Sequence, residues 1–275
     1  MTIRVEMMLL ILLLFQGCKD REKQQPNFVF FLVDDMGYSD VGCFGSDYYE
    51  TPNIDQLANQ GMRFTSYYAT CSLCSPTRSS ILTGKYAARL HITHAIPILG
   101  YKRLEGGTAT PLRDANYIMN LPLEEVTIAE ALKTAGYATA SIGKWHLGID
   151  SEYYPEFQGF DLNIGGNGHG HTGEFFFPYY TKWRMAENYP WEEWNTLPDG
   201  VPGEYLTDRL TSEAVKYIEE KKDVPFFLYL SHYAIHTPIE AIDSIIKKYE
   251  SKPADSLKGH VKPNYDAMIE SVDHG

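Results

Sequence analysis

The sequence predicts an α/β fold in which a central, mostly parallel β-sheet is flanked by helices. Two strongly apolar runs, residues 27–33 and 225–231, lack the alternation of a half-exposed strand, which is typical of strands buried on both faces of a parallel sheet. Between them, a helix pattern at residues 127–135 is followed directly by a strand pattern at residues 137–142. A chain of 275 residues is long enough for one sizeable core, and the sequence contains no evident repeat or second domain.

Composition and charge narrow the class of partner. Hydrophobic residues make up 44% of the chain and charged residues 22%, as in an ordinary globular protein. The formal net charge of -12 argues against a nucleic-acid partner, which would need a basic face. An anionic substrate is not excluded, because a few local cations can dominate a pocket.

The N-terminus resembles an export signal. Arg4 precedes an apolar run, residues 7–15, that is too short to span a bilayer. The Phe-Gln-Gly-Cys sequence that ends at Cys18 resembles a bacterial lipobox, in which the cysteine is lipidated after cleavage. Residues 1–18 would then be the signal and residues 19–26 a polar tether; a plain cleaved signal is the alternative. Either way we expect an exported protein, periplasmic or an outer-membrane lipoprotein.

Several shorter patterns divide the rest of the chain into elements. Residues 51–58 predict a capped helix that ends near Gly61, and residues 62–69 predict a strand. Residues 97–120 carry few signals and are expected to form a loop at the substrate rim. Residues 179–202, rich in aromatic residues and proline, also predict a loop.

Two adjacent carboxylates, Asp34 and Asp35, follow the first apolar run. Open α/β sheets bind ligands at the carboxyl ends of their strands. Neighbouring acids repel each other, and a hard divalent cation between them relieves that repulsion. We therefore interpret the pair as candidate metal ligands, with a solvated acidic turn as the alternative.

Cys74 lies at the start of a short helical pattern. Pro76 suits the first helical turn, where its missing N–H has no cost, and the positive end of the helix would favour negative charge at Cys74. Arg78 lies one turn later, so that its guanidinium can reach back and bind an oxyanion in a forked manner. A buried structural cysteine beside a surface arginine is the alternative interpretation.

Basic side chains and imidazoles follow the second strand pattern. Lys144 and His146 alternate, so both would project to the same side of an extended segment. The glycine-rich run at residues 165–172 contains His169 and His171, which are weaker candidates for lining a pocket.

The last third of the chain predicts a helix, a strand and another helix. An amphipathic pattern covers residues 205–221, the apolar run follows, and residues 265–274 predict the final helix. His236 comes soon after the strand, and an imidazole at a strand end is well placed to donate a proton near neutral pH. His232 is interpreted as structural.

Several of these segments together resemble the signature motifs of the sulfatase family. The matching sequences are Cys-Ser-Pro-Thr-Arg-Ser-Ser-Ile-Leu-Thr-Gly (74–84), Gly-Lys-Trp-His-Leu-Gly (143–148), His-Thr-Pro (236–238), the Asp-Asp pair, Thr-Pro-Asn-x-Asp-x-Leu (51–57) and Gly-Phe-Asp (159–161). The resemblance implies an alkaline phosphatase-like sandwich with its C-terminal part missing. Residues 27–275 would be an incomplete N-terminal catalytic domain, since the chain has no Asp-Asn dipeptide to complete the metal ligands and the family's further lysine cannot be placed.

The resemblance also implies a modified residue and a metal. In the family, the cysteine equivalent to Cys74 is oxidised to formylglycine by a formylglycine-generating enzyme. Asp34, Asp35 and the residue at position 74 would bind Ca²⁺ or Mg²⁺. Modification of Cys74 would leave Cys43 and Cys71 available to pair with each other.

The remaining site residues take roles by the same resemblance. Arg78 and Lys144 would stabilise the sulfate oxygens, His146 would contact the formylglycine hydroxyl, and His236 would protonate the leaving alcohol. The implied substrate is a sulfated glycan or an aryl sulfate. Two alternatives stay open: a phosphonate or phosphodiester hydrolase of the same superfamily, and a truncated or degenerate protein without catalytic activity.

Overall fold

The computed structural model describes residues 25–96, 116–183, 192–197, 199–253 and 262–275. The predicted signal, Cys18 and most of the predicted 97–120 loop lie outside these residues. Among the helices of the described part, none is both long enough and apolar enough to cross a bilayer.

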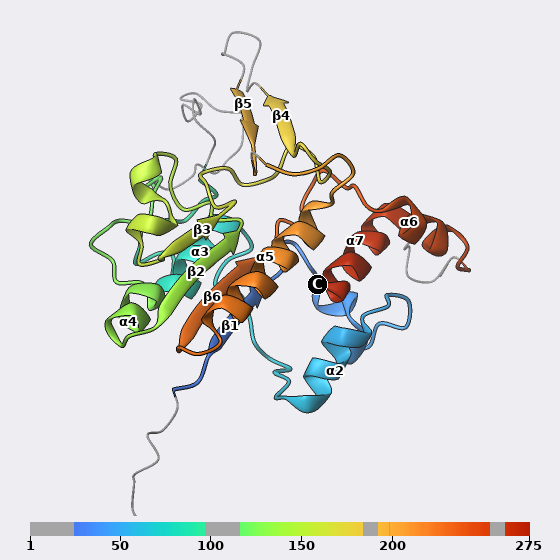
Figure 1. Ribbon diagram of the computed structural model, residues 1–275, viewed down its shortest axis with the longest axis horizontal. Coiled ribbons are helices and arrows are strands. Elements are labelled where there is room, and N and C mark those ends of the chain that lie inside the picture. The colour runs from blue at the N-terminus through green and yellow to red at the C-terminus, as the bar shows by residue number, and fades with distance from the viewer. Residues whose placement is uncertain (1–24, 97–115, 184–191, 198, 254–261) are drawn as a thin grey trace, which may run out of the picture.

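Four parallel strands form the central sheet, which confirms the predicted α/β class. They are β1 (Phe28–Leu32), β6 (Phe226–Ser231), β2 (Ala138–Gly143) and β3 (Leu162–Ile164), in that spatial order (Figure 1). Leu32, Ser231 and Gly143 are partners in the register. The three longer strands therefore end at the same level, and the segments that follow them meet at one edge of the sheet.

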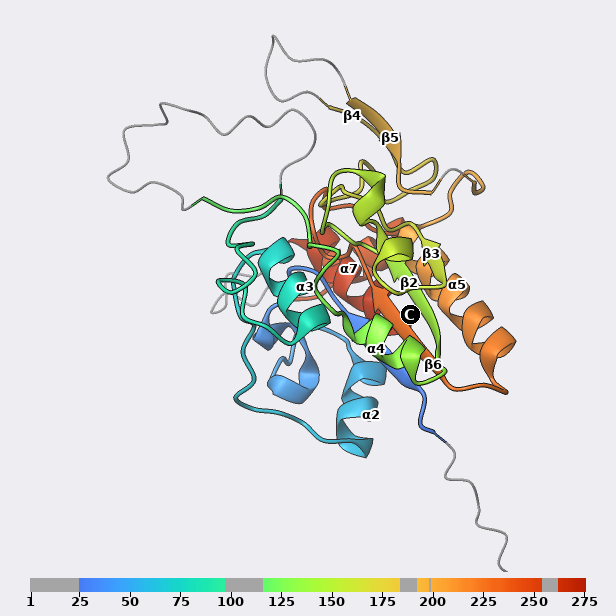
Figure 2. The ribbon, with the colours of Figure 1, turned by 90° about the vertical axis from the view of Figure 1, so that its left-hand side faces the viewer.

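Helices cover both faces of this sheet, as Figures 1 and 2 show. The helices on one side are α5 (Leu206–Lys221) and α7 (Pro263–His274), and those on the other are α3 (Cys74–Thr83) and α4 (Ile128–Thr134). Strand β6 explains the two layers: Leu228 and Leu230 pack in the core with α5, whereas Phe227 and Tyr229 pack in the core with α3 and α4. Alternation of side chains along the strand thus fills both cores, and the predicted burial of this strand is confirmed.

Strand β1 corrects the prediction of a strand buried on both faces. It lies at the edge of the sheet and pairs with β6 alone among the described strands. Phe28 is 42% exposed, Val29 51%, Phe30 37% and Phe31 39%. The apolar run correctly predicted a parallel strand, but composition carries no information on where in a sheet the strand lies.

The other predictions meet with mixed outcomes. Helix α2 (Pro52–Gln60), the α4 helix with its capping box at Thr127, and helices α5 and α7 form where the patterns place them. The predicted strand at residues 62–69 is wrong, because this exposed segment has no regular structure.

Four further strands and α-helices of the described chain were missed, and the short strand β3 is one of them. The predicted loop at residues 179–202 instead contains a hairpin of β4 (Tyr180–Trp183) and β5 (Glu192–Asn195). Helix α6 (Asp243–Glu250) was not predicted, and four short 3₁₀ turns lie at residues 38–40, 42–44, 151–153 and 155–157.

Candidate active site

The predicted site residues meet at the carboxyl edge of the sheet. Asp34 follows β1, and its backbone N–H donates to the carbonyl of Ala234 at 2.9 Å. Lys144 follows β2, and its backbone N–H donates to the carbonyl of Ser231 at 2.7 Å. These backbone bonds hold the ends of three strands together, so residues far apart in sequence share one small volume.

Asp34, Arg78 and Lys144 form a buried ionic cluster. Arg78 Nη2 lies 3.2 Å from Asp34 Oδ1, and Lys144 Nζ contacts Asp34 Oδ2. Burial by itself raises the pKa of Asp34, but the charges of Lys144 and Arg78 outweigh it and hold that pKa below its ordinary value. Burial lowers the pKa of Lys144, although the Asp34 charge partly offsets this effect. With both cations charged, the cluster carries one net positive charge in a buried place and favours an anion there.

Arg78 is held by more partners than its motif indicates. Its Nη1 donates to the carbonyl of Lys144 at 2.7 Å and to Ser231 Oγ at 2.5 Å. Its Nε is buried and finds no hydrogen-bond acceptor among the described residues. The guanidinium was predicted to bind an oxyanion through two nitrogens, but in this structure its Nη1 and Nη2 bind protein atoms instead. Its Nε–H can still donate a hydrogen bond to a ligand. Sequence reasoning missed Ser231, whose only signal was its position at the end of an apolar strand.

Cys74 is the first residue of α3, as predicted, and Leu73 is the N-cap. The free thiol is partly buried and lies near enough to Arg78 and Lys144 to interact with their charges. Cys43 and Cys71 are also free thiols, so the pairing considered from the sequence is not formed in this structure.

His146 presents one ring nitrogen to the site. Its Nε2 lies 2.6 Å from the carbonyl of Ile96 and donates to it, which makes Nδ1 the nitrogen with the lone pair. Nδ1 is buried and has no partner among the described residues. Burial, followed by the nearby Lys144 charge, lowers the pKa of His146 well below 6.5, so the ring is a neutral acceptor at neutral pH. The backbone at His146 has φ of 59°, not the extended conformation assumed from the alternation with Lys144.

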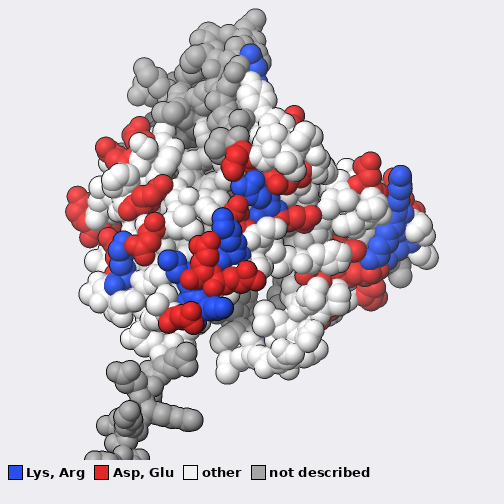
Figure 3. All heavy atoms as spheres, viewed as in Figure 1, with Lys and Arg blue, Asp and Glu red and all other residues white. Residues whose placement is uncertain are grey.

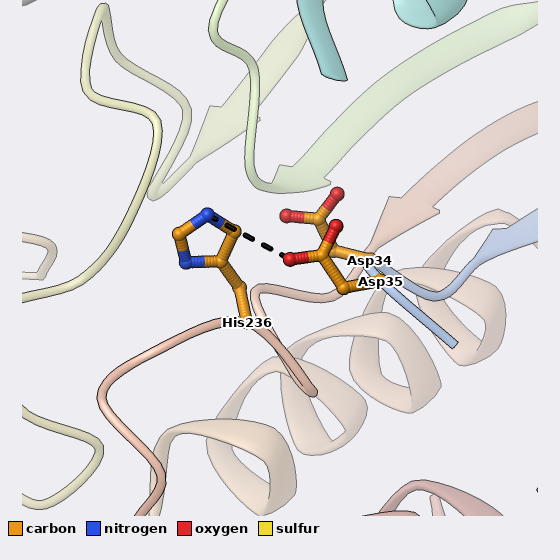
Figure 4. A group of neighbouring side chains, drawn as sticks. All are labelled: Asp34, Asp35 and His236. Atoms are coloured by element: carbon orange, nitrogen blue, oxygen red, sulfur yellow. Dashed lines mark ion pairs between the residues drawn. The ribbon is translucent and has the colours of Figure 1, made fainter. Parts of the chain in front are cut away.

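Asp35 and His236 lie at the open side of the same edge. His236 Nε2 is 3.8 Å from Asp35 Oδ2, and Asp35 adopts φ of 61°. Figure 4 shows both carboxylates and the imidazole turned toward one space. Single ligand atoms of Asp34, Asp35 and His236 all lie within 4.8 Å of one another, which suits a metal ion.

The donor set fits a divalent cation in part. Carboxylate oxygens are hard ligands, but Ca²⁺ takes about six to eight oxygens, more than Asp34 and Asp35 provide. Both oxygens of Asp34 also contact the buried cations, so a metal would share this carboxylate with them. Cys74 is not a member of the group, and its role as a metal ligand stays a prediction.

The two weaker histidine candidates also reach this region. The His171 ring is nearly parallel to the His236 ring, with centroids 6.2 Å apart and planes at 10°. Burial, with the nearby His171 charge, lowers the pKa of His169 to about 4. The structure thus places His171 beside His236, while His169 is a partly buried residue of the same loop.

Charges elsewhere on the molecule are mixed. On the face in Figure 3, basic side chains lie among acidic ones. Arg209, for example, is paired with Asp199, Glu204 and Glu213. The concentration of cations around Asp34 is therefore a local feature of an acidic protein.

Comparisons with known proteins identify the family of this chain. The Sulfatase family profile matches residues 26–275. The chain is 32% identical over 271 residues to arylsulfatase G of Rattus norvegicus, covering 88% of this chain and 48% of that protein. It is 34% identical over 226 residues to N-acetylgalactosamine-6-sulfatase of Sus scrofa, covering 79% of this chain and 41% of that protein.

Among solved structures, Ps i-CgsB superposes with a TM-score of 0.69 at 29% identity, covering 91% of this chain and 53% of that one. The same protein has been solved with k-i-k-neocarrahexaose bound. The chain spans about half the length of the relatives that it matches. By its sequence profile, its relatives and its fold, the chain belongs to the sulfatase family.

Proposed function

We propose that this chain carries the nucleophile and the sulfate-binding residues of a sulfatase that hydrolyses sulfate esters, with Cys74 converted to formylglycine. The observation that carries the proposal is the buried cluster of Asp34, Arg78 and Lys144 beside Cys74. Its excess positive charge and the unsatisfied Arg78 Nε–H suit a sulfate group placed at the first turn of α3.

Each residue of the site then has its own role in the proposed reaction. Arg78 and Lys144 hold sulfate oxygens, and Asp34 keeps both cations charged and oriented. His146 Nδ1 accepts a proton from a hydroxyl at position 74, and His236 donates a proton to the leaving alcohol oxygen. Formylglycine, as its hydrate, would supply that hydroxyl and the nucleophile. In net terms, water and the ester give an alcohol and sulfate.

A divalent cation belongs to this proposal as well. Asp34 and Asp35 would hold Ca²⁺ or Mg²⁺, with His236 at the side of the same space. When bound, it would supply positive charge next to the sulfate oxygens. Isothermal titration with Ca²⁺ tests this part, and Asp35→Asn is expected to weaken the binding.

Turnover experiments test the reaction. The chain is produced with and without a formylglycine-generating enzyme and assayed on 4-nitrophenyl sulfate, N-acetylgalactosamine 6-sulfate and a 4-nitrophenyl phosphodiester. We expect the sulfate esters to be the better substrates, with activity lost in Cys74→Ala and reduced about 10²- to 10³-fold in Arg78→Lys. Preference for the phosphodiester would instead support the alternative hydrolase.

Mass spectrometry of the peptide around Cys74 checks the modification independently of turnover. Conversion of the CH2–SH side chain to the aldehyde CHO removes sulfur and two hydrogens and adds one oxygen, which changes the peptide mass and distinguishes formylglycine from serine. A peptide that keeps its sulfur in a host able to convert it would argue against a formylglycine enzyme.

Export is a separate part of the proposal. Residues 1–18 would direct the chain out of the cytoplasm, and Cys18 would carry a lipid. Fractionation of cells that produce the protein tests this, because Cys18→Ala should move it from the membrane to the soluble fraction.

A further inference from the structure

The residues of the site differ in burial. We call Arg78, Lys144 and His146 the floor of the site, and Asp35 and His236 its mouth. Arg78 and Lys144 are almost completely buried, at 1% and 0% exposure, and His146 is 5% exposed. The side chain of His236 is 25% exposed and that of Asp35 is 61% exposed. In the proposed reaction the sulfate therefore binds at the floor, and the group that leaves with the ester oxygen lies at the mouth.

The glycine-rich loop that carries His171 is part of this mouth. The carbonyl of Asn167 accepts the backbone N–H of His146 at 3.0 Å. A Cβ at Gly170 would lie only 2.4 Å from His146 Cε1, so the loop backbone packs directly against that ring. The loop thus contacts one proposed functional imidazole through its backbone and, through His171, another.

Hydrogen bonds beyond the glycines fix the position of His171. Thr172, which is fully buried, donates from Oγ1 to the carbonyl of Glu174 at 2.7 Å and accepts from Thr196 Oγ1 at 2.9 Å. The Phe175 N–H donates to Glu240 Oε2 at 2.8 Å, and Glu240 is close in sequence to His236. The loop is therefore held at the site by the structure and needs no ligand to bring it there.

The hydrogen bonding of the His171 ring decides which of its nitrogens can accept a hydrogen bond from a ligand. Nδ1 lies 2.8 Å from the carbonyl of Thr172, so Nδ1 carries the proton. In the neutral ring, Nε2 is then the hydrogen-bond acceptor. The ring lies nearly parallel to that of His236, with the two centroids 6.2 Å apart, so a ligand bound at His236 is also close to His171.

We infer that His171 is a specificity-determining residue, whose imidazole accepts a hydrogen bond from a hydroxyl of the leaving group. This inference rests on the proposed function. His236 must reach the ester oxygen to protonate it, and the neighbouring hydroxyls of a sugar then lie within reach of the parallel ring. A simple aryl leaving group has no such hydroxyl, so His171 distinguishes the two kinds of ester.

The experiment compares two substrates on one protein. For wild type and His171→Ala, kcat/KM is measured on N-acetylgalactosamine 6-sulfate and on 4-nitrophenyl sulfate. We expect the ratio of sugar to aryl kcat/KM to fall about tenfold in His171→Ala, as for the loss of one ordinary hydrogen bond. A partly unfolded sample does not disturb the result, because the active fraction cancels in the ratio.

Two variants make the result specific. His171→Gln, which keeps an acceptor, should recover part of the ratio. His274→Ala removes a solvent-exposed imidazole at the end of α7 and should leave the ratio unchanged. Where turnover is too slow to measure, dissociation constants of the same two esters replace kcat/KM, with the same expected change.

The outcomes separate this inference from the function beneath it. If wild type acts on or binds both esters and the ratio in His171→Ala stays within about twofold, the role of His171 is wrong and the sulfatase proposal stands. If wild type neither turns over nor binds either ester, the proposed function fails and the role of His171 fails with it.

Discussion

At the scale of single residues, Asp34 and Asp35 show how surroundings separate identical side chains. The Asp34 side chain is 8% exposed and contacts two buried cations, whereas that of Asp35 is 61% exposed. Removing one partner of a buried ionic cluster leaves the other charges without compensation, which is much more costly than losing a surface charge.

Substitution by asparagine at each position should therefore give different results. We expect Asp34→Asn to lower the free energy of unfolding by about 3–5 kcal/mol, because Lys144 and Arg78 lose their carboxylate. Asp35→Asn should change it by less than about 0.5 kcal/mol, since asparagine also tolerates the positive φ at this position. Urea denaturation in the absence of metal measures both. Equal losses would show that Asp34 does not compensate the cations.

A second prediction concerns acid sensitivity through His232. This ring is completely buried with no partner for either nitrogen among the described residues, and burial lowers its pKa from 6.5 to about 4. As the pH falls below 6.5, the unfolded chain binds a proton that the folded chain does not bind. The free energy of unfolding therefore falls, by about 2 kcal/mol for this group at pH 5 relative to pH 7.

The substitution His232→Phe should remove the part of the pH dependence of stability that comes from this imidazole. Urea denaturation measures the free energy of unfolding at pH 7 and at pH 5. The difference between the two values should be smaller in His232→Phe than in wild type by about 2 kcal/mol. His274→Ala serves as the exposed control and should leave the wild-type difference in place. An unchanged difference in His232→Phe would mean that His232 gains a proton in the folded state.

At the scale of elements, the approach of β2 to β6 determines how the chain enters the site. Gly143 ends β2 with φ of 98°, and its Cα lies so close to β6 that a Cβ would be 1.9 Å from the carbonyl oxygen of Ser231. The same carbonyl accepts the N–H of Lys144. A glycine is thus required where the chain leaves the sheet and turns toward Asp34.

Gly84 offers a matched comparison for this requirement. It also has a positive φ, of 67°, but a Cβ there would meet no atom within 4 Å. We expect Gly84→Ala to cost about 1 kcal/mol of unfolding free energy, from backbone strain alone. Gly143→Ala should cost about 3 kcal/mol or more, because overpacking adds to the strain. Similar losses in the two variants would contradict the close approach of the strands.

At the scale of the whole molecule, β1 leaves one edge of the described sheet unpaired. Four consecutive apolar residues, 28–31, are each at least 37% exposed, and the run contains no charge and no proline. Flat apolar edge strands without such protection pair with other chains. We therefore expect the 31.3-kDa chain to self-associate in dilute buffer.

Light scattering with two lysine variants tests this expectation. Val29→Lys places a charge on the edge strand and should shift the average mass toward that of one chain. Val215→Lys, on α5, changes a valine of similar exposure, 50% against 51%, and should leave the association as it is. Equal effects of the two lysines would show that the association does not involve β1.

The sequence by itself determined the class of fold and the order of most elements, and it proposed the candidate site residues that the structure brings together. These depend on local patterns: apolar runs predict strands, the pattern at residues 127–135 predicts a helix, and short motifs single out Cys74, Lys144 and His236 as candidates. Local patterns failed where the outcome depends on neighbours, as for the predicted strand at residues 62–69.

The tertiary structure alone decided which of these residues touch and how deeply each is buried. Asp34 and Lys144 are 110 positions apart and share a salt bridge, and Ser231 orients Arg78 from a third strand. It also placed β1 at an edge that its composition does not reveal. The physical reason is that burial and ion pairing are properties of contacts between distant segments, and those contacts exist only once strands and helices have packed.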